Sequence, residues 1–223
     1  YASNATFGSG ADLGSGSYVV YVGGNTSVTV SGMGPGTNYY VEVFAYKGTV
    51  ADSSVDQGIN YRQTSPAAGS RSTLAAEPTA DATSLSFSAV GTYQMTVNWT
   101  SGNGANRIVV VRQGSAVSWT PTDGAAPSGT ISTNFGSATA QDGNGNKVCY
   151  DGSGSSFTLT GLDADTTYYV KIFEYNGSSV TANYYTGGTP LAGSQATTPA
   201  ACIPDQVVLR QTNTCYFKWG DGG

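Results

Sequence analysis

The sequence contains no histidine, and charged residues make up only 10% of the chain. Without histidine, the Ser-His-Asp and Cys-His arrangements of hydrolases are excluded, together with nearly all catalytic zinc sites. The nine lysines and arginines are scattered singly, and the formal net charge is −5. Because a nucleic-acid surface needs a basic stripe to neutralise phosphates, the sequence predicts no nucleic-acid partner.

Long apolar runs and secretion signals are also missing, so this segment is not expected to insert into a membrane. Cysteine is limited to Cys149, Cys202 and Cys215. Cys202 and Cys215 enclose a short loop, which favours a disulfide between them and an oxidising compartment; two reduced buried thiols are the alternative.

What the chain does contain is glycine, tyrosine and β-formers. There are 31 Gly and 15 Tyr, and Thr, Ser, Val and Tyr dominate the patterned stretches. No stretch of helical length keeps a 3.6-residue period free of glycine or β-branched residues. The sequence therefore predicts an all-β protein of antiparallel sheets.

One pattern occurs twice: an alternating strand, a tight corner and a second alternating strand, at 28–48 and again at 157–177. Tyr39, Tyr40, Phe44 and Tyr46 return as Tyr168, Tyr169, Phe173 and Tyr175, each 129 positions later. Later still, TCYFKWG at 214–220 echoes 96–100, with Trp219 in the place of Trp99. Repetition of one supersecondary unit predicts a repeat protein.

The repeats predict three regions. Residues 1–74 match the C-terminal part of a repeat, 75–198 form a complete repeat with a long insertion near 120–146, and 199–223 begin a third. Linkers are expected at 73–78 and 199–204, and the chain is expected to be a piece of something longer. Within the complete repeat, strands are predicted at 84–87, 93–99, 107–112, 148–150, 157–159, 168–175 and 193–197, and the insertion has room for one short strand.

Trp99 on an early strand and Leu162 in the corner, followed by Thr166, Tyr168, Val170 and Ile172, resemble the fibronectin type III pattern of immunoglobulin-like sandwiches. The earlier copy keeps Thr37, Tyr39, Val41 and Val43, with Met33 in the leucine position. The phrase GTxYYVxxFxYNG followed by NY is similar to repeats of very large secreted bacterial surface proteins, many exported by the type IX route. This resemblance implies tandem sandwiches in an extracellular or cell-surface protein that serves adhesion, gliding or a biofilm matrix. The long segment after Trp119 departs from ordinary fibronectin domains.

Residues able to carry chemistry are few. Cys149 matches Val20 of the earlier copy, which favours a small buried apolar side chain over a nucleophile. Glu174 shares the inward parity of Ile172, but the earlier copy has Ala45 there. We expect Glu174 to reach solvent at the strand end or to pair with a lysine, and we expect no catalysis.

Asp142, Asn144 and Asn146 have the alternating oxygen spacing of a calcium loop, and Asp151 and Asp123 could add ligands. However, Ser153 stands where such a loop carries its bidentate acid, and the DG, NG and GN pairs are also typical of hairpin turns. A calcium loop and a hairpin turn therefore both stay open for these residues, and no other cofactor is expected.

The outward parity of the long strand carries large aromatic side chains: Tyr169, Phe173 and Tyr175, and in the earlier copy Tyr40, Phe44 and Tyr46. Three interpretations stay open: the insertion covers this face, a neighbouring repeat or chain packs on it, or it binds surface glycans. Thr166, in the sequence DTT, resembles a bacterial O-glycosylation site but also occupies the structural corner position.

The sequence thus favours a non-catalytic stalk or fibre region of a long extracellular bacterial protein, whose partners are neighbouring repeats and other copies in a fibre. The alternatives are a carbohydrate- or calcium-binding accessory module of a secreted enzyme, or the subunit of an extracellular filament.

Overall fold

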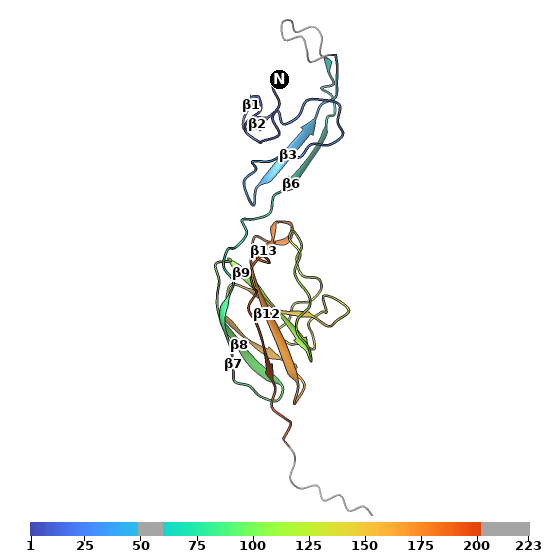
Figure 1. The fold of residues 1–223 in the computed structure, drawn as a ribbon. Helices are drawn as coiled ribbons and strands as arrows, with labels where there is room; N and C mark the ends of the chain where they lie inside the picture. The colour runs from blue at the N-terminus through green and yellow to red at the C-terminus, as the bar shows by residue number, and fades with distance from the viewer. Residues whose placement is uncertain (49–59, 202–223) are drawn as a thin grey trace, which may run out of the picture.

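The computed structural model describes residues 1–48 and 60–201. Within these ranges the chain is all β apart from one 3₁₀ turn at Ser179–Thr181, and no helix is long and apolar enough to cross a membrane. The chain forms two parts that lie end to end, an N-terminal unit (residues 1–74) and a sandwich (residues 79–197) (Figure 1). The predicted Cys202–Cys215 disulfide and most of the predicted third repeat lie outside the described residues.

The sandwich consists of two antiparallel sheets, which confirms the predicted fold class. The first sheet has the order β11-β8-β7, and in the second β10, β9, β12 and β13 follow one another while β14 also pairs with β12. The strand bounds are β7 Thr83–Ser88, β8 Gln94–Thr100, β9 Asn106–Gln113, β10 Lys147–Gly152, β11 Ser156–Thr160, β12 Thr167–Asn176, β13 Asn183–Tyr184 and β14 Ala192–Ala196. Each strand predicted in this region is present, with bounds shifted by one or two residues.

The main core lies between the two sheets and follows the period-2 alternation of the strands. Strand β8 contributes Met95, Val97 and Trp99 to it, and β12 contributes Tyr168, Val170 and Ile172. Strand β9 supplies Val109 and Val111, and β11 supplies Phe157 and Leu159.

A second core lies on the opposite face of β9 and β12. Here Ile108, Val110, Phe173 and Tyr175 are buried, and Val117, Trp119 and Ile131 of the long connection pack against them. Residues 114–146 form no named strand, only bridges from Asn134 to Thr160 and from Ala140 to Lys147. The insertion therefore covers this face of the sheet without extending the sheet, and the short strand for which the sequence left room is not formed.

The N-terminal unit contains short strands: β1 Asp12–Gly14, β2 Ser17–Tyr18, β3 Asn38–Val43, β4 Tyr46–Lys47, β5 Asn60–Tyr61 and β6 Ala67–Ser72. They pair as β1 with β2, β3 with β6 and β4 with β5. The described part of this unit contains no counterpart of β7, β8 or β9.

Local geometry in the N-terminal unit nevertheless repeats that of the sandwich. The Phe7 and Tyr39 rings meet edge to face at 5.0 Å and 77°, as Phe135 and Tyr168 do at 5.1 Å and 77°. The Phe7 amide donates to the Ser31 carbonyl at 2.8 Å, and the Phe135 amide donates to that of Thr160 at the same distance.

Phe173 of the sandwich and the equivalent Phe44 of the N-terminal unit should respond differently to replacement by alanine. Phe173→Ala should lower the free energy of unfolding by about 3–5 kcal/mol, because the ring is removed from a packed core. The matched change Phe44→Ala should cost less than about 1 kcal/mol, since that ring is 44% exposed. Calorimetry together with denaturant titration would measure both; equal losses would contradict the described burial.

Candidate functional site

The corner before the long strand is held by the same bonds in both units. The Asp163 amide donates to the Tyr168 hydroxyl at 2.8 Å, and the Gly34 amide donates to that of Tyr39 at 2.7 Å. This is the geometry of a tyrosine corner. Thr166 is half-buried and its hydroxyl donates to the Ala164 carbonyl at 2.8 Å, so it serves the corner; its glycosylation stays a prediction.

Glu174 is fully buried and forms an ion pair with Arg107, contrary to the expectation that it reaches solvent or a lysine. Arg107 Nε donates to Glu174 Oε1 at 3.1 Å, and the two residues are direct cross-strand partners on β9 and β12. The carboxylate also accepts the Gly102 and Gly104 amides, each at 3.1 Å. The alternation of the sequence indicates that Glu174 points inward, but its partner depends on the register between β9 and β12, which the sequence alone does not specify.

The other N–H groups of the Arg107 guanidinium donate to backbone carbonyls. The guanidinium donates to the carbonyls of Gly104 at 3.0 Å and Gly154 at 2.8 Å, and also to that of Ser153. A buried ion pair avoids a large desolvation cost only when its other polar groups are also satisfied. This network thus fixes the 101–105 loop against β12 at the pole of the sandwich next to the linker.

The linker itself is held by hydrogen bonds from both sides. On its N-terminal side, the Gly36 amide donates to the Leu74 carbonyl at 2.6 Å and the Thr73 amide to the Thr37 carbonyl at 3.0 Å. On the other side, the Ala75 amide donates to the Thr181 carbonyl at 2.8 Å.

Two asparagines of the sandwich complete the contact with the linker. Asn183 Nδ2 donates to the Ala75 carbonyl and Asn176 Nδ2 to that of Ala76, both at 2.8 Å. Just beyond, Asn103 Oδ1 accepts the Thr79 and Ala80 amides at 2.9 and 3.0 Å. The linker backbone is therefore ordered by specific polar contacts, which the sequence did not reveal because an Asn-Gly or Asn-Tyr pair looks like ordinary turn sequence.

The Asp142 loop is a turn whose oxygens already have partners. Asp142 accepts the Asn144 amide at 3.0 Å and Asn146 Nδ2 at 2.8 Å, while Asn146 Oδ1 accepts the Ser118 amide at 3.1 Å. Asp151 and Asp123 are engaged elsewhere, with the Tyr175 hydroxyl at 2.6 Å and the Tyr184 amide at 2.8 Å. Among the described residues, no group of three His, Cys, Asp or Glu side chains could hold a metal ion. Calcium binding stays a prediction.

The aromatic side chains of outward parity differ in burial between the two units. In the sandwich, Phe173 is 1% and Tyr175 8% exposed, so they are not surface residues; Tyr169 is half-buried. The first of the three interpretations, coverage by the insertion, is thus the one found in the sandwich. In the N-terminal unit Tyr40 is 80% exposed, Phe44 is also exposed, and Tyr46 is half-buried.

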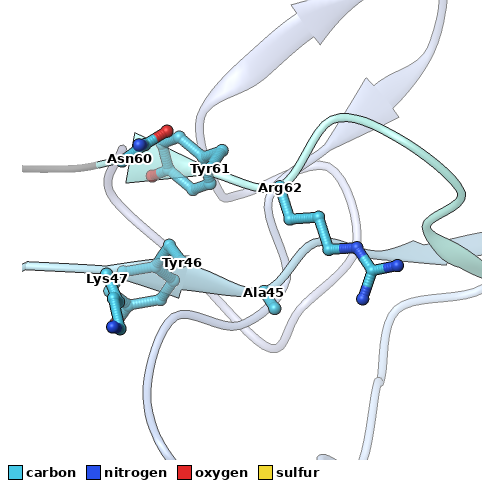
Figure 2. A pocket seen from close by; sticks show the side chains of 6 residues that line it. All are labelled: Ala45, Tyr46, Lys47, Asn60, Tyr61 and Arg62. Carbon is cyan, nitrogen blue, oxygen red and sulfur yellow. The ribbon is translucent and has the colours of Figure 1, made fainter.

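Tyr46 lies at a shallow pocket of about 270 Å³ in the N-terminal unit, lined by Ala45, Tyr46, Lys47, Asn60, Tyr61 and Arg62. Its Tyr46 and Tyr61 rings come from adjacent strands and lie 5.7 Å apart (Figure 2). The equivalent rings in the sandwich, Tyr175 and Tyr184, lie 5.0 Å apart and are buried. Burial raises the pKa of both hydroxyls, that of Tyr184 to about 12. The Tyr46–Tyr61 ring pair at this pocket is therefore the less buried equivalent of the Tyr175–Tyr184 contact in the sandwich.

Cys149 lies fully buried in the main core, and burial raises the pKa of its thiol to about 12. A thiol of this kind stays protonated at neutral pH and does not act as a nucleophile. The side chain is a small apolar core group, as its match with Val20 predicts.

Removing the acid of the buried ion pair tests the polar network. Glu174→Ala should lower the free energy of unfolding by about 3–5 kcal/mol, because Arg107 is left buried without its counter-charge. The double variant R107M/E174A should recover part of the loss, and Glu77→Ala, at an exposed position, is the matched control. Denaturant titration measures all three; a loss for Glu174→Ala no larger than for the control would contradict the network.

The Asp142 turn predicts a pH dependence. Desolvation raises the pKa of Asp142, but the hydrogen bonds from Asn146 and Asn144 outweigh it, so the pKa lies below its usual value. Because the pKa of Asp142 is lower in the folded state than in the unfolded state, the ionised carboxylate stabilises the fold above the unfolded-state pKa of about 3.9. This stabilisation is lost as the pH falls through the folded-state pKa. The stability difference between wild type and Asp142→Asn should accordingly shrink below about pH 4. A difference that stays constant with pH would show that the charge is not involved.

Comparisons with known proteins concern the fold. No protein-family model matches the chain, and no curated protein matches it. Among solved structures, a fibronectin type III domain of human collagen XX is 18% identical, covering 57% of this chain and all of that one, with a TM-score of 0.33. A two-domain fibronectin type III segment of chicken tenascin is 18% identical over 76% of this chain and 68% of that one, with a TM-score of 0.32. The rat CD45 extracellular region is 17% identical, covering 84% and 78% respectively, with a TM-score of 0.35. The assignment as an antiparallel β-sandwich rests on the strand pairing within this chain.

Proposed function

We propose that residues 1–74 and 75–198 belong to consecutive fibronectin type III-like repeats, and that they act as a non-catalytic spacer in the stalk or fibre of an extracellular bacterial surface protein. The observation that carries this proposal is the linker between them, which is hydrogen-bonded on both sides. A spacer must hold the parts of a protein on either side of it at a defined distance. The distance between two domains depends on the stiffness of the linker that joins them.

The linker is stiffened at nearly every position. Thr73 and Leu74 are bonded to the N-terminal unit, Ala75 and Ala76 to the sandwich, and Pro78 is buried with a backbone dihedral fixed by its ring. A typical hydrogen bond contributes about 1 kcal/mol, so bending the junction would require several such contributions to be lost together.

The path of the chain suits a spacer as well. The chain enters the sandwich from the linker at one pole and leaves β14 at the opposite pole (Figure 1). Units connected in this way add length along one axis instead of folding back on each other. The bacterial surface setting is supported by the GTxYYVxxFxYNG resemblance, and the few charges are compatible with exposure outside the cell.

Asn176 and Asn183 provide the test. The double variant N176A/N183A removes both side-chain donors to the linker and should broaden the distribution of angles between the two units. Small-angle X-ray scattering would show this as a reduced maximum dimension and a less structured distance distribution. Asn98→Ala is the matched control, because its amide bonds Ser88 within the sandwich and not the linker.

An elongated wild-type particle with a narrow distribution supports the spacer. A wild-type chain that already samples a broad range of angles would contradict it. Saturable binding of a glycan with no change in particle shape would instead favour the accessory binding module.

A further inference from the structure

The sequence contains three Asn-Gly pairs, which begin at Asn103, Asn144 and Asn176. Asparagine followed by glycine is prone to spontaneous deamidation, because glycine has no side chain to hinder attack by its own backbone nitrogen. In this reaction the glycine nitrogen forms a bond to the asparagine Cγ, and Nδ2 leaves as ammonia together with the proton that the nitrogen gives up. Water then opens the resulting succinimide ring at either carbonyl, which gives aspartate or isoaspartate.

Exposure to solvent does not separate the three pairs. Asn103 and Asn144 are both exposed, and Asn176 is half-buried. The reaction requires that the side-chain amide turns toward the next backbone nitrogen and that this nitrogen loses its proton. Hydrogen bonds at either group oppose the reaction, so the bonds around each pair decide whether it reacts in the folded protein.

Both reacting groups of the Asn103 pair are held. Asn103 Oδ1 accepts the Thr79 and Ala80 amides at 2.9 and 3.0 Å, and Nδ2 donates to the Thr79 hydroxyl at 2.8 Å. The attacking nitrogen is that of Gly104, and its N–H donates to Glu174 Oε2 at 3.1 Å. A carboxylate acceptor favours the protonated nitrogen, because hydrogen bonds to a charged group are stronger than neutral ones.

The side chain of Asn176 is held at both of its polar atoms. Its Oδ1 accepts the Ala105 amide at 2.7 Å, and its Nδ2 donates to the Ala76 carbonyl at 2.8 Å. To turn toward the nitrogen of Gly177, the side chain would have to leave both partners. Loss of two hydrogen bonds lowers the reactive population about tenfold or more.

The Asn144 pair is held only weakly at the groups that react. Asn144 Nδ2 lies 3.5 Å from Asp142 Oδ2, and the nitrogen of Gly145 lies 3.5 Å from the Asp142 carbonyl oxygen. Both distances exceed the usual range for a hydrogen bond. The Asn144 backbone amide donates to Asp142 Oδ1 at 3.0 Å, which orders the turn without holding either reacting group.

We propose that Asn144 is a site of spontaneous deamidation in the folded protein, and that the hydrogen bonds next to the linker protect Asn103 and Asn176 from the same reaction. The product places a new carboxylate beside Asp142 and makes the formal net charge of −5 more negative by one. The asparagine contacts of the linker persist while the turn changes. This modification goes beyond the spacer role and does not depend on it.

The experiment follows each Asn-Gly pair of the complete 223-residue chain during incubation at mildly alkaline pH, which favours loss of the proton from the attacking nitrogen. Samples are digested at acidic pH to stop the reaction, and mass spectrometry quantifies the amide and acid forms of each peptide. In the folded chain, Asn144 should convert about tenfold or more faster than Asn103 and Asn176. In concentrated guanidinium chloride, where the hydrogen bonds are absent, the three pairs should convert at similar rates.

Three variants test the assignment and its cause. Asn144→Gln removes the reactive pair, so the more acidic species that forms first in wild type on ion exchange should not form. Thr79→Val removes the hydroxyl that Asn103 Nδ2 bonds, so conversion of Asn103 should become faster while that of Asn144 stays the same. Thr96→Val is the matched control, because its hydroxyl lies near that of Thr158 and bonds no Asn-Gly pair.

Several results would overturn the proposal. One is a folded chain in which Asn144 converts no faster than Asn103, since exposure alone would then govern the reaction. Another is a rate at Asn144 that is far lower in the folded chain than in denaturant, since the turn would then protect it too. An unchanged rate at Asn103 in Thr79→Val would show that its hydrogen bonds do not protect it. Particle shape enters none of these outcomes, so they are independent of the test of the spacer.

Discussion

The structure depends on the pairing of β12 along both of its edges. From Tyr168 to Tyr175 this strand is bonded to β9, and its other edge is bonded to β14 and β13. Both faces of β12 are also covered, one by the β7–β8–β11 sheet and the other by the insertion. The equivalent strand β3 has β6 on one edge and ends at Val43, and its apolar side chains remain exposed. One strand pattern thus gives a core or an open surface according to its neighbours.

The buried ion pair depends on the same neighbour. Glu174 is buried because β9 places Arg107 directly opposite it, and that pair in turn holds the loop at 101–105. Residues of this pole also bind the linker, through Asn103 and Asn176. The pole next to the linker is therefore held by polar contacts, whereas the middle of the sandwich is apolar. In the N-terminal unit, where the described residues include no β9 counterpart, the residue at this position is Ala45, which needs no cation.

The sequence by itself determined the all-β class and each strand predicted in the sandwich, because alternation, turn residues and the 129-residue repeat are local signals. It also indicated that Cys149 is a core residue and that Glu174 points inward. Only the tertiary structure decided that Glu174 meets Arg107, that Phe173 and Tyr175 are covered, and that Asn176 and Asn183 hold the linker. The physical reason is that each of these depends on the register of a distant strand or the path of a long connection. The segments 27–31 and 156–160 show this most directly, because one alternating pattern forms a strand only where a partner strand is present.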